Sequence, residues 1–412
     1  MNHPLRVLVI SDLFPNPSHP AFGIFVERQC HYLQDYCQQV VVAPVRVFPH
    51  LRIWKNILKP GEFARTWLEW RRGLNKIPSQ GELNGLMVYY PRYTSLPKQI
   101  FLGTWGYFAY PAIALLLRRL YEQYHFDLIH AHFASPAGTI ALLAQRWMRV
   151  PIVLSVHGYD LFYMTKQNKL NRDIIINVFN KVDAILANSN KTAQGIASYG
   201  IELSKIHLVR LGANPEIFIP DSTESATNHI EILSVGYLTK RKGHEFVLRA
   251  MADLMQRGYS LRYTIVGDGP EEAHLRKLTH QLDLDQYVSF EGYKPHDQVW
   301  SYFSHCDLFV LPSWNEAFGL VYVEALWMGK PVIGCQGEGG PEDLKTLGDC
   351  IELVKPRSVK SLVEAMERLI NDPIRRKEMG EKGKYISQKY FSWSTTAEKT
   401  YQIYSTVVNK TG

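Results

Sequence analysis

Short apolar runs alternate with stretches of helical pattern along the whole 412-residue chain. Each run is apolar at every position rather than at every second one, which predicts parallel strands buried on both faces and separated by helices. The expected strands are residues 7–10, 40–43, 128–131, 152–156, 184–187, 206–209, 231–235, 262–266, 288–290, 308–311, 332–333 and 351–354. The pattern therefore predicts an α/β chain with doubly wound parallel sheets.

The length predicts two domains, because a chain of this size exceeds one ordinary hydrophobic core. The change of domain is expected near Leu211-Gly-Ala-Asn-Pro215, which gives a first domain of residues 1–212 and a second of residues 213–391. In open α/β sheets, ligands bind at the carboxyl ends of the strands. We therefore expect the functional residues in the loops that follow the strands.

Positive charge is concentrated in the first half of the chain. Residues 1–210 carry 23 Lys and Arg against 12 Asp and Glu (net +11), whereas residues 211–412 carry 23 against 27 (net −4). This asymmetry predicts a polyanionic partner for the first half only, and nucleic acid and an anionic membrane both fit. Five cysteines without Cys-x-x-Cys spacing, and no signal before the first apolar run, favour a cytoplasmic location.

The segment 46–76 combines basic and aromatic side chains: Arg46, Arg52, Lys55, Lys59, Arg65, Arg71, Arg72 and Lys76, with Trp54, Phe63, Trp67 and Trp70. Interfacial helices that dock on anionic lipid have this composition. A solvated helical hairpin that packs its tryptophans on its own domain has it too. The most apolar run, residues 101–117, is shorter than the roughly 20 residues that a membrane span needs.

Two acidic residues, Glu316 and Glu324, are separated by small or apolar residues only. The first is expected in a loop after a strand, and the second about two turns into the next helix. The backbone N–H groups of Phe318, Gly319 and Leu320 would begin that helix, and helix N-termini favour anions. Carboxylates can accept hydrogen bonds from sugar hydroxyls, and backbone amides can bind phosphates, so this arrangement suits a sugar nucleotide.

Four further motifs accompany this pair: Val235-Gly-Tyr-Leu-Thr-Lys-Arg-Lys-Gly243, Ile265-Val-Gly-Asp-Gly-Pro270, Phe290-Glu-Gly-Tyr293 and Glu338-Gly-Gly-Pro-Glu342. In this order, the set resembles the donor site of the family 4 retaining glycosyltransferases of the GT-B fold, most specifically over residues 231–345. The resemblance implies two Rossmann-like domains that face each other across a cleft. It also implies a last helix, within residues 392–412, that crosses back to the first domain.

The same resemblance implies the roles of the donor-side residues. Lys242 would meet the donor diphosphate, Glu324 the ribose hydroxyls and Glu316 a hydroxyl of the transferred sugar. We take His157, Lys242 and Glu316 as the catalytic set. The donor-binding set predicted in this way is Gly23, Gly236, Arg241, Gly267, Tyr293, Ala317, Phe318, Gly319, Leu320 and Glu324.

One position departs from the family pattern. Many relatives have Arg directly after the strand glycine, whereas Gly236 is followed by Tyr237. Lys240 or Arg241 is left to supply the second cation. In the last motif, Pro341 is expected at the first position of a helix, behind two glycines whose amides would face the donor.

The acceptor side is expected in the first domain. His157 ends a strand beside Asp160, and its counterpart in relatives lies next to the reacting sugar. His130 and His132 point to the same face of another strand end, His132 toward the acceptor and His130 into the packing. Ser189, after the strand 184–187, is a weaker member of this set.

The opening of the chain, Ser11-Asp-Leu-Phe-Pro-Asn-Pro17 to Gly23-Ile-Phe-Val-Glu-Arg28, and the strand end His130-Ala-His-Phe133 resemble transferases of bacterial surface polysaccharide assembly. This implies a UDP-sugar or other nucleotide-sugar donor and a polyprenyl-linked saccharide acceptor. An anionic membrane surface, at the inner face of the plasma membrane, is then the expected partner and nucleic acid is not. No cofactor or metal is expected, and Asp283-Leu-Asp285 is interpreted as a chance match to a metal motif.

Three other functions are alternatives to this interpretation. An NAD-dependent oxidoreductase would need a third-glycine fingerprint with an acidic residue about 20 positions on, and neither domain has it. A non-catalytic sugar-nucleotide-binding module would not need Glu316 or His157. An epimerase on the same two-domain fold remains the nearer alternative.

Overall fold

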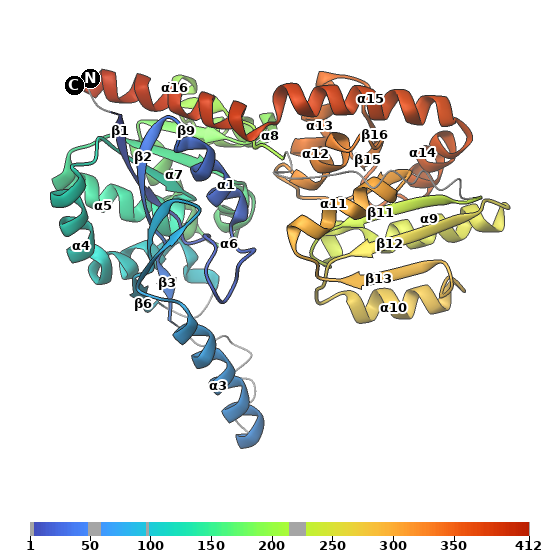
Figure 1. Cartoon of the computed structure of the whole chain (residues 1–412), viewed down its shortest axis with the longest axis horizontal. Helices are drawn as coiled ribbons and strands as arrows, with labels where there is room; N and C mark the ends of the chain where they lie inside the picture. Colours follow the sequence, from blue (N-terminus) through green and yellow to red (C-terminus); the bar gives the residue numbers. More distant parts are fainter. Residues whose placement is uncertain (1–3, 48–58, 96–98, 214–227, 412) are drawn as a thin grey trace. The chain divides into compact units, whose positions relative to one another are not determined.

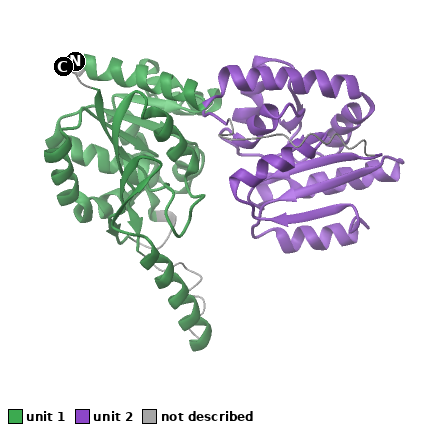
Figure 2. Cartoon of the chain, in the orientation of Figure 1, with its two compact units in different colours: residues 1–210, 393–412 green, residues 211–392 purple. Residues whose placement is uncertain are grey.

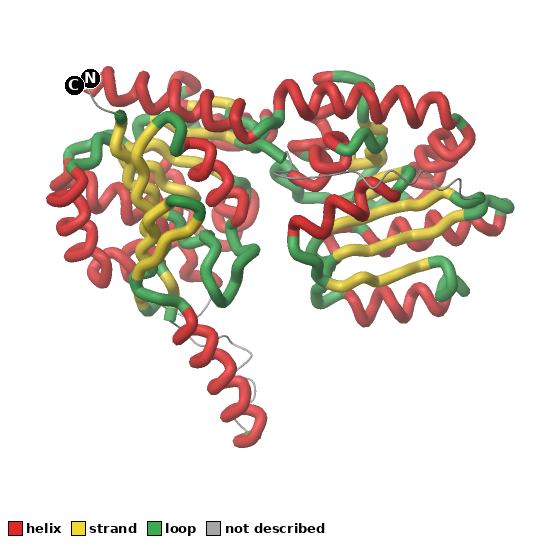
Figure 3. Tube along the Cα trace, viewed as in Figure 1, coloured by secondary structure: helices red, strands yellow, loops and turns green. Residues whose placement is uncertain are grey.

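The computed structural model describes residues 4–47, 59–95, 99–213 and 228–411. The chain forms two compact units, coloured in Figure 2. Unit 1 comprises Met1–Arg210 and Trp393–Gly412, and unit 2 comprises Leu211–Ser392. Each unit contains one main β-sheet covered by helices on both faces (Figure 3).

Unit 1 has an eight-stranded sheet in the order β10-β9-β8-β7-β1-β2-β5-β4. All neighbours are parallel except β4, which pairs antiparallel with β5. The strands are β1 Leu5–Ile10, β2 Cys37–Val42, β4 Gln80–Leu83, β5 Leu86–Tyr89, β7 Leu128–His132, β8 Ile152–Val156, β9 Ala184–Ala187 and β10 Ile206–Leu208. A separate parallel pair is formed by β3 Val45–Arg46 and β6 Arg92–Tyr93.

The helices of unit 1 cover both faces of its sheet, except for α3, which projects away from it (Figure 1). They are α1 Ile24–Leu33, α3 Pro60–Lys76, α4 Trp105–Tyr124, α5 Thr139–Met148, α6 Thr165–Gln167, α7 Lys169–Lys181, α8 Asn190–Ala197 and α16 Trp393–Thr411. One buried core joins α4, α5 and α7 to one face of the sheet, and a second joins α1 and α16 to the other. The doubly wound arrangement is thereby confirmed for this unit.

The last helix of the chain belongs to unit 1, as expected. α16 packs against α1 (Figure 1). Between these two helices, Gln29 Nε2 donates a hydrogen bond to Thr400 Oγ1 at 3.0 Å. The fully buried Tyr404 hydroxyl lies 2.6 Å from His130 Nδ1. The carboxyl-terminal segment therefore completes the core of the first unit.

Unit 2 has a six-stranded, fully parallel sheet in the order β13-β12-β11-β14-β15-β16. Its strands are β11 Ile230–Val235, β12 Leu261–Val266, β13 Val288–Gly292, β14 Leu308–Val310, β15 Val332–Cys335 and β16 Ile351–Val354. Its helices are α9 His244–Gln256, α10 Glu272–Gln281, α11 His296–His305, α12 Leu320–Trp327, α13 Gly339–Leu347, α14 Val359–Asn371 and α15 Pro373–Tyr390.

Every expected strand is present, with its ends within three residues of the expected ones; the largest difference is at β2, which begins at Cys37 rather than at residue 40. The sequence analysis missed β3, β4, β5 and β6. β4 and β5 alternate between more and less buried positions, so they lack the continuous apolar run of a central strand. β3 and β6 have two residues each, too few to form a pattern.

Helix α3 carries the described part of the basic, Trp-rich segment, and Arg52, Trp54 and Lys55 lie outside the described residues. No side chain of α3 is fully buried, and Trp67 and Trp70 are half-buried with ring centroids 5.0 Å apart. Arg92 fastens the carboxyl end of the helix by donating to Leu74 O at 3.0 Å. The tryptophans of α3 are therefore not part of the core of unit 1.

Among the described helices, none combines the length and apolar character needed to cross a bilayer.

Candidate active site

A buried ion pair lies at the carboxyl edge of the unit 2 sheet. The short helix Lys240–Lys242 follows β11 and places Lys242 Nζ 2.7 Å from Glu316 Oε2, with both side chains close to 90% buried (11% and 12% exposed). Arg241 Nη1 lies 3.2 Å from the same oxygen and is 45% exposed. Ser313 Oγ donates to it at 3.3 Å. Two cations thus converge on one carboxylate. Of the two residues expected to supply the second cation, Lys240 and Arg241, it is Arg241 that contacts Glu316.

The charge of Glu316 is set by its neighbours. Burial by itself would raise the pKa of this carboxyl, but Lys242 first and Arg241 second outweigh burial and lower the pKa below its ordinary value. Glu316 is therefore ionised at neutral pH, and the cluster has two positive charges against one negative. An additional anion is electrostatically favoured here.

Glu338 holds the loop that carries Glu316. Its buried carboxylate accepts hydrogen bonds from the N–H groups of Asn315 at 3.0 Å and Glu316 at 2.7 Å. The Gly339 N–H donates to Glu316 O at 3.2 Å, so this amide is already used. The prediction of Pro341 at the first helical position is wrong, because α13 begins two residues earlier, at Gly339. Sequence reasoning missed this use of Glu338, because no local pattern relates residues that are more than 20 positions apart.

Glu324 lies on α12, which begins at Leu320 after the N-cap Gly319. It is the fifth residue of the helix, just over one turn in, so the prediction of about two turns was wrong. Residues 315–318 remain in the loop that Glu338 holds. Glu324 is 5% exposed, and its Oε1 lies 2.9 Å from His296 Nε2 at the start of α11. His296 carries no sequence signal for this contact.

Backbone contacts bring three strand ends together. A Cβ at Gly267 would lie 2.1 Å from Gly236 O, so glycine is required for this approach. The Gly267 N–H donates to Gly292 O at 2.8 Å. Beyond this edge, the rings of Tyr237 and Tyr293 are 60% and 55% exposed. The predicted donor-side residues of unit 2 therefore gather at one edge of the sheet.

The backbone between Glu316 and Glu324 lies in the same region. The Phe318 side chain is buried against Phe391, with ring centroids 5.8 Å apart, so its backbone is the part that can meet a ligand. Ala317 precedes it in the loop, and Gly319, with a φ of 82°, and Leu320 begin α12. The N-terminus of α12 thus lies between Glu316 and Glu324 in the sequence.

A stack of neutral histidines lies in unit 1. His132 on β7 and His157 after β8 have parallel rings with centroids 5.3 Å apart, and His132 Nδ1 lies 3.1 Å from His157 Nε2. Burial lowers the pKa of His157 to about 3 and the pKa of His132 well below its ordinary value. Their other ring nitrogens have no hydrogen-bond partner among the described residues. Both rings can therefore offer a hydrogen bond to a neutral ligand.

The other predicted residues of unit 1 occupy structural positions. His130 lies 2.8 Å from Ser155 Oγ and contacts Tyr404, consistent with packing. Asp160 accepts from the Ala134 and Leu161 N–H groups at 3.0 and 3.1 Å, while burial raises its pKa to about 6. Ser189 is fully buried as the N-cap of α8, where it accepts from the Thr192 N–H at 3.1 Å.

Gly23 and the Asp283-Leu-Asp285 motif are the remaining positions singled out in the sequence, and each has a local structural role. Gly23 is the N-cap of α1, with a φ of 71°, and a Cβ there would lie 2.2 Å from Leu13 O. Asp285 pairs with His280 at 2.9 Å. Among the described residues, no group of three or more His, Cys, Asp or Glu side chains is arranged to hold a metal ion.

Comparisons with known proteins agree with this division of the chain. Residues 77–217 match the model of Glycosyltransferase Family 4, and residues 216–385 match that of Glycosyl transferases group 1. A putative teichuronic acid biosynthesis glycosyltransferase of Bacillus subtilis, TuaC, is 27% identical over 98% of this chain and 99% of its own length. A putative colanic acid biosynthesis glycosyltransferase of Escherichia coli, WcaL, is 30% identical over 52% of this chain and 55% of its own.

Solved structures show the same fold. Sucrose-phosphate synthase of Thermosynechococcus elongatus has a TM-score of 0.78 at 20% identity, covering 98% of this chain and 100% of that one. HepE of Anabaena, in complex with UDP, has a TM-score of 0.70 at 19% identity with the same coverage. These likenesses confirm the GT-B fold.

Proposed function

Since the chain belongs to the family 4 glycosyltransferases, we propose that it transfers a sugar from a nucleotide diphosphate sugar to a lipid-linked saccharide, with retention at the anomeric carbon. UDP is the first candidate nucleotide, supported by the UDP-bound HepE structures. Surface polysaccharide assembly is the proposed setting, supported by the names of TuaC and WcaL.

The cluster of Lys242, Arg241 and Glu316 carries this proposal. Its two cations face one carboxylate oxygen, at 2.7 and 3.2 Å. A donor diphosphate would compete with Glu316 for these cations, because phosphate oxygens make the same charge-assisted contacts. Once displaced from Lys242, the Glu316 carboxylate would be available to accept a hydrogen bond from a hydroxyl of the transferred sugar.

The rest of the donor is assigned to neighbouring residues. Glu324, oriented by His296 at 2.9 Å, would accept hydrogen bonds from the ribose hydroxyls. The exposed Tyr293 follows the strand end at Gly292 and would border the base. The N-terminus of α12, at Gly319, would favour the diphosphate through its backbone amides.

The proposed mechanism is a front-face displacement. The acceptor hydroxyl would attack the anomeric carbon on the face from which the diphosphate departs, and its proton would pass to the departing phosphate oxygen. Lys242 and the N-terminus of α12 would stabilise the negative charge that develops on the diphosphate. His157, neutral at pH 7, would donate a hydrogen bond to the sugar. The proposal requires no metal, since protein cations balance the phosphate charge.

Helix α3 is proposed to dock the protein on the inner, anionic face of the plasma membrane. Arg71, Arg72 and Lys76 are exposed on it, and each basic residue near such a surface contributes about 1 kcal/mol. Reversing all three to Glu should abolish co-sedimentation with phosphatidylglycerol vesicles at low salt. Reversing Lys360, Lys377 and Lys384, exposed in unit 2, is the control. Equal pelleting of both variants would refute the docking role.

The donor is tested by a thermal-shift screen of UDP-, GDP- and ADP-sugars, followed by calorimetry with the best ligand. We expect a UDP-sugar to stabilise wild-type protein, and Lys242→Ala to lose the effect. No stabilisation by any of these nucleotides would overturn the proposal. Conversion of a UDP-sugar into its epimer without acceptor would favour the epimerase instead.

A further inference from the structure

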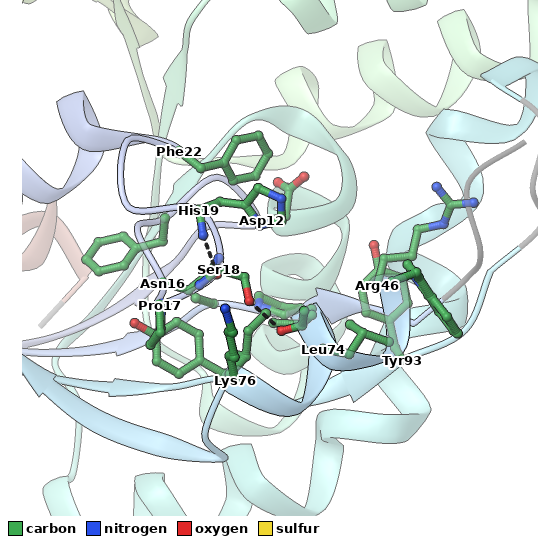
Figure 4. A pocket seen from close by; sticks show the side chains of 18 of the residues that line it. Asp12, Asn16, Pro17, Ser18, His19, Phe22, Arg46, Leu74, Lys76 and Tyr93 are labelled. Atoms are coloured by element: carbon green, nitrogen blue, oxygen red, sulfur yellow. Dashed lines mark hydrogen bonds between the residues drawn. The ribbon is translucent and has the colours of Figure 1, made fainter. Parts of the chain in front are cut away.

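A cavity of about 650 Å³ lies in unit 1 (Figure 4). Its walls come from the loop after β1, the segment from β2 to β3, the carboxyl-terminal half of α3, the residues around β6 and the start of α4. The loop after β1 and the segment after β2 follow the carboxyl ends of parallel strands, where α/β sheets bind ligands. α3, proposed above to meet the membrane, forms another wall.

Aromatic rings form part of the cavity walls. Phe14, Trp70, Tyr93 and Trp105 line the cavity, and the guanidinium carbon of Arg46 lies 4.1 Å from the Trp105 ring centroid. Ligand sites characteristically combine such apolar and aromatic walls with a few polar groups that set orientation. A pyranose ring fits this surface, because it has apolar C–H faces and a rim of hydroxyls.

Asp12 supplies the polar group. It stands two residues after β1 on the cavity wall, with His19 and Phe22 on the same loop (Figure 4). Its Oδ1 is buried and has no hydrogen-bond partner among the described residues. Buried carboxylate oxygens are normally satisfied, so an unsatisfied one facing a cavity indicates a ligand hydroxyl or water as its partner.

The ionisation of Asp12 agrees with this geometry. Burial, followed by the nearby Asp160, raises its pKa to about 7, although its own backbone N–H opposes the shift. Tyr93 and Tyr159 also interact with it electrostatically. The cavity is further lined by the titratable side chains of His19, Arg46, Arg65, Glu69 and Lys76. The carboxyl therefore changes charge near neutral pH, and the ionised form is the stronger hydrogen-bond acceptor.

We infer that this cavity binds a pyranose ring of the saccharide acceptor, with Asp12 accepting a hydrogen bond from one of its hydroxyls. The inference rests on the proposed function for the identity of the saccharide as acceptor. It adds Asp12 as a residue that orients the acceptor, and it places the lipid-linked end of the molecule toward α3.

Saturation-transfer NMR of the full chain tests the inference, with methyl pyranosides of gluco, galacto, manno and N-acetylglucosamine configuration as probes. We expect at least one to bind, and Asp12→Asn to weaken it roughly tenfold at pH 8, as for loss of a charged hydrogen-bond partner. Wild-type affinity should rise from pH 6 to pH 8, whereas affinity of Asp12→Asn should stay level. Asp173→Asn, exposed on α7, is the matched control.

Two further measurements separate this site from the donor site. Glu316→Gln should bind the pyranoside as wild type does, and a loss there would place the sugar in unit 2 and overturn the inference. UDP binding is measured on the same samples. If UDP binds but no pyranoside does, or if Asp12→Asn binds the pyranoside as tightly as wild type, the inference about the cavity fails and the proposed function stands. If a pyranoside binds at Asp12 but no nucleotide binds, the proposed function fails alone.

Discussion

The ion-pair cluster of unit 2 and the histidine stack of unit 1 bury polar groups in opposite ways. In unit 2, Glu316 keeps its charge because Lys242 and Arg241 lie within 2.7 and 3.2 Å of one oxygen. In unit 1, no described carboxylate forms an ion pair with His132 or His157, and burial keeps both rings neutral. The two cations of unit 2 suit a diphosphate, and the neutral rings of unit 1 suit the hydroxyls of a sugar. The difference lies in whether the fold brings an opposite charge close to the buried group.

The largest expected effect is the acid sensitivity of the histidine stack. The folded pKa of His157, about 3, lies below the value of about 6.5 in the unfolded chain. The unfolded state therefore binds more protons between these values, and stability is lost as pH falls from about 6.5 to 3. The full shift corresponds to about 5 kcal/mol, and the partial exposure of the His157 side chain reduces this loss.

His157→Phe should reduce this pH dependence, since the new ring would lie among Phe25 and Phe133. Urea unfolding at pH 7, 5.5 and 4.5 measures it, with His280→Gln, an exposed histidine, as the control. An unchanged slope in His157→Phe would break the comparison, because it would mean that the stack is already protonated or solvated at neutral pH.

Removal of the central cation of unit 2 comes next. Lys242→Ala should weaken UDP binding roughly ten- to a hundredfold, because a charge-assisted hydrogen bond contributes about 1.5 to 3 kcal/mol. Calorimetry with UDP measures the effect, and Lys277→Ala, exposed on α10, is the control. Equal affinities in the two variants would mean that the cluster is purely structural.

Glu324→Ala should raise the dissociation constant of UDP about tenfold, because the ribose would lose a charged acceptor. Turnover at saturating donor should change less, since the ribose is remote from the reacting bond. Steady-state kinetics and calorimetry separate the two quantities. A fall in turnover without a change in UDP affinity would reassign Glu324 to the reacting sugar.

The smallest and most diagnostic effect concerns Glu316. Glu316→Gln should tighten UDP binding a fewfold, because Lys242 and Arg241 would no longer be held by a competing carboxylate. The same change should lower turnover, because the sugar hydroxyl would lose its charged acceptor. Glu316→Gln and Glu324→Ala would thus move UDP affinity in opposite directions. Weaker UDP binding in Glu316→Gln would show that the ion pair positions Lys242 rather than competing for it.

The pattern of residues along the chain determined the strand order in sequence, the helices between strands and the membership of the candidate donor site. Central parallel strands are apolar at every position, and this signal is local. Glycine motifs are also local, because the close approach at Gly236 and Gly267 needs residues without a Cβ. These features could be predicted before any contact was known.

Only the tertiary structure decided how the buried polar groups are paired. The contacts of Lys242 with Glu316, His296 with Glu324 and Glu338 with the 315–316 amides join residues 22 to 74 positions apart. The cavity beside Asp12 exists only because α3 forms another of its walls, and the edge strands β4 and β5 depend on the sheet that they extend. No local periodicity encodes such partners, because charge state and hydrogen bonding depend on what the fold places within about 3 Å of each group.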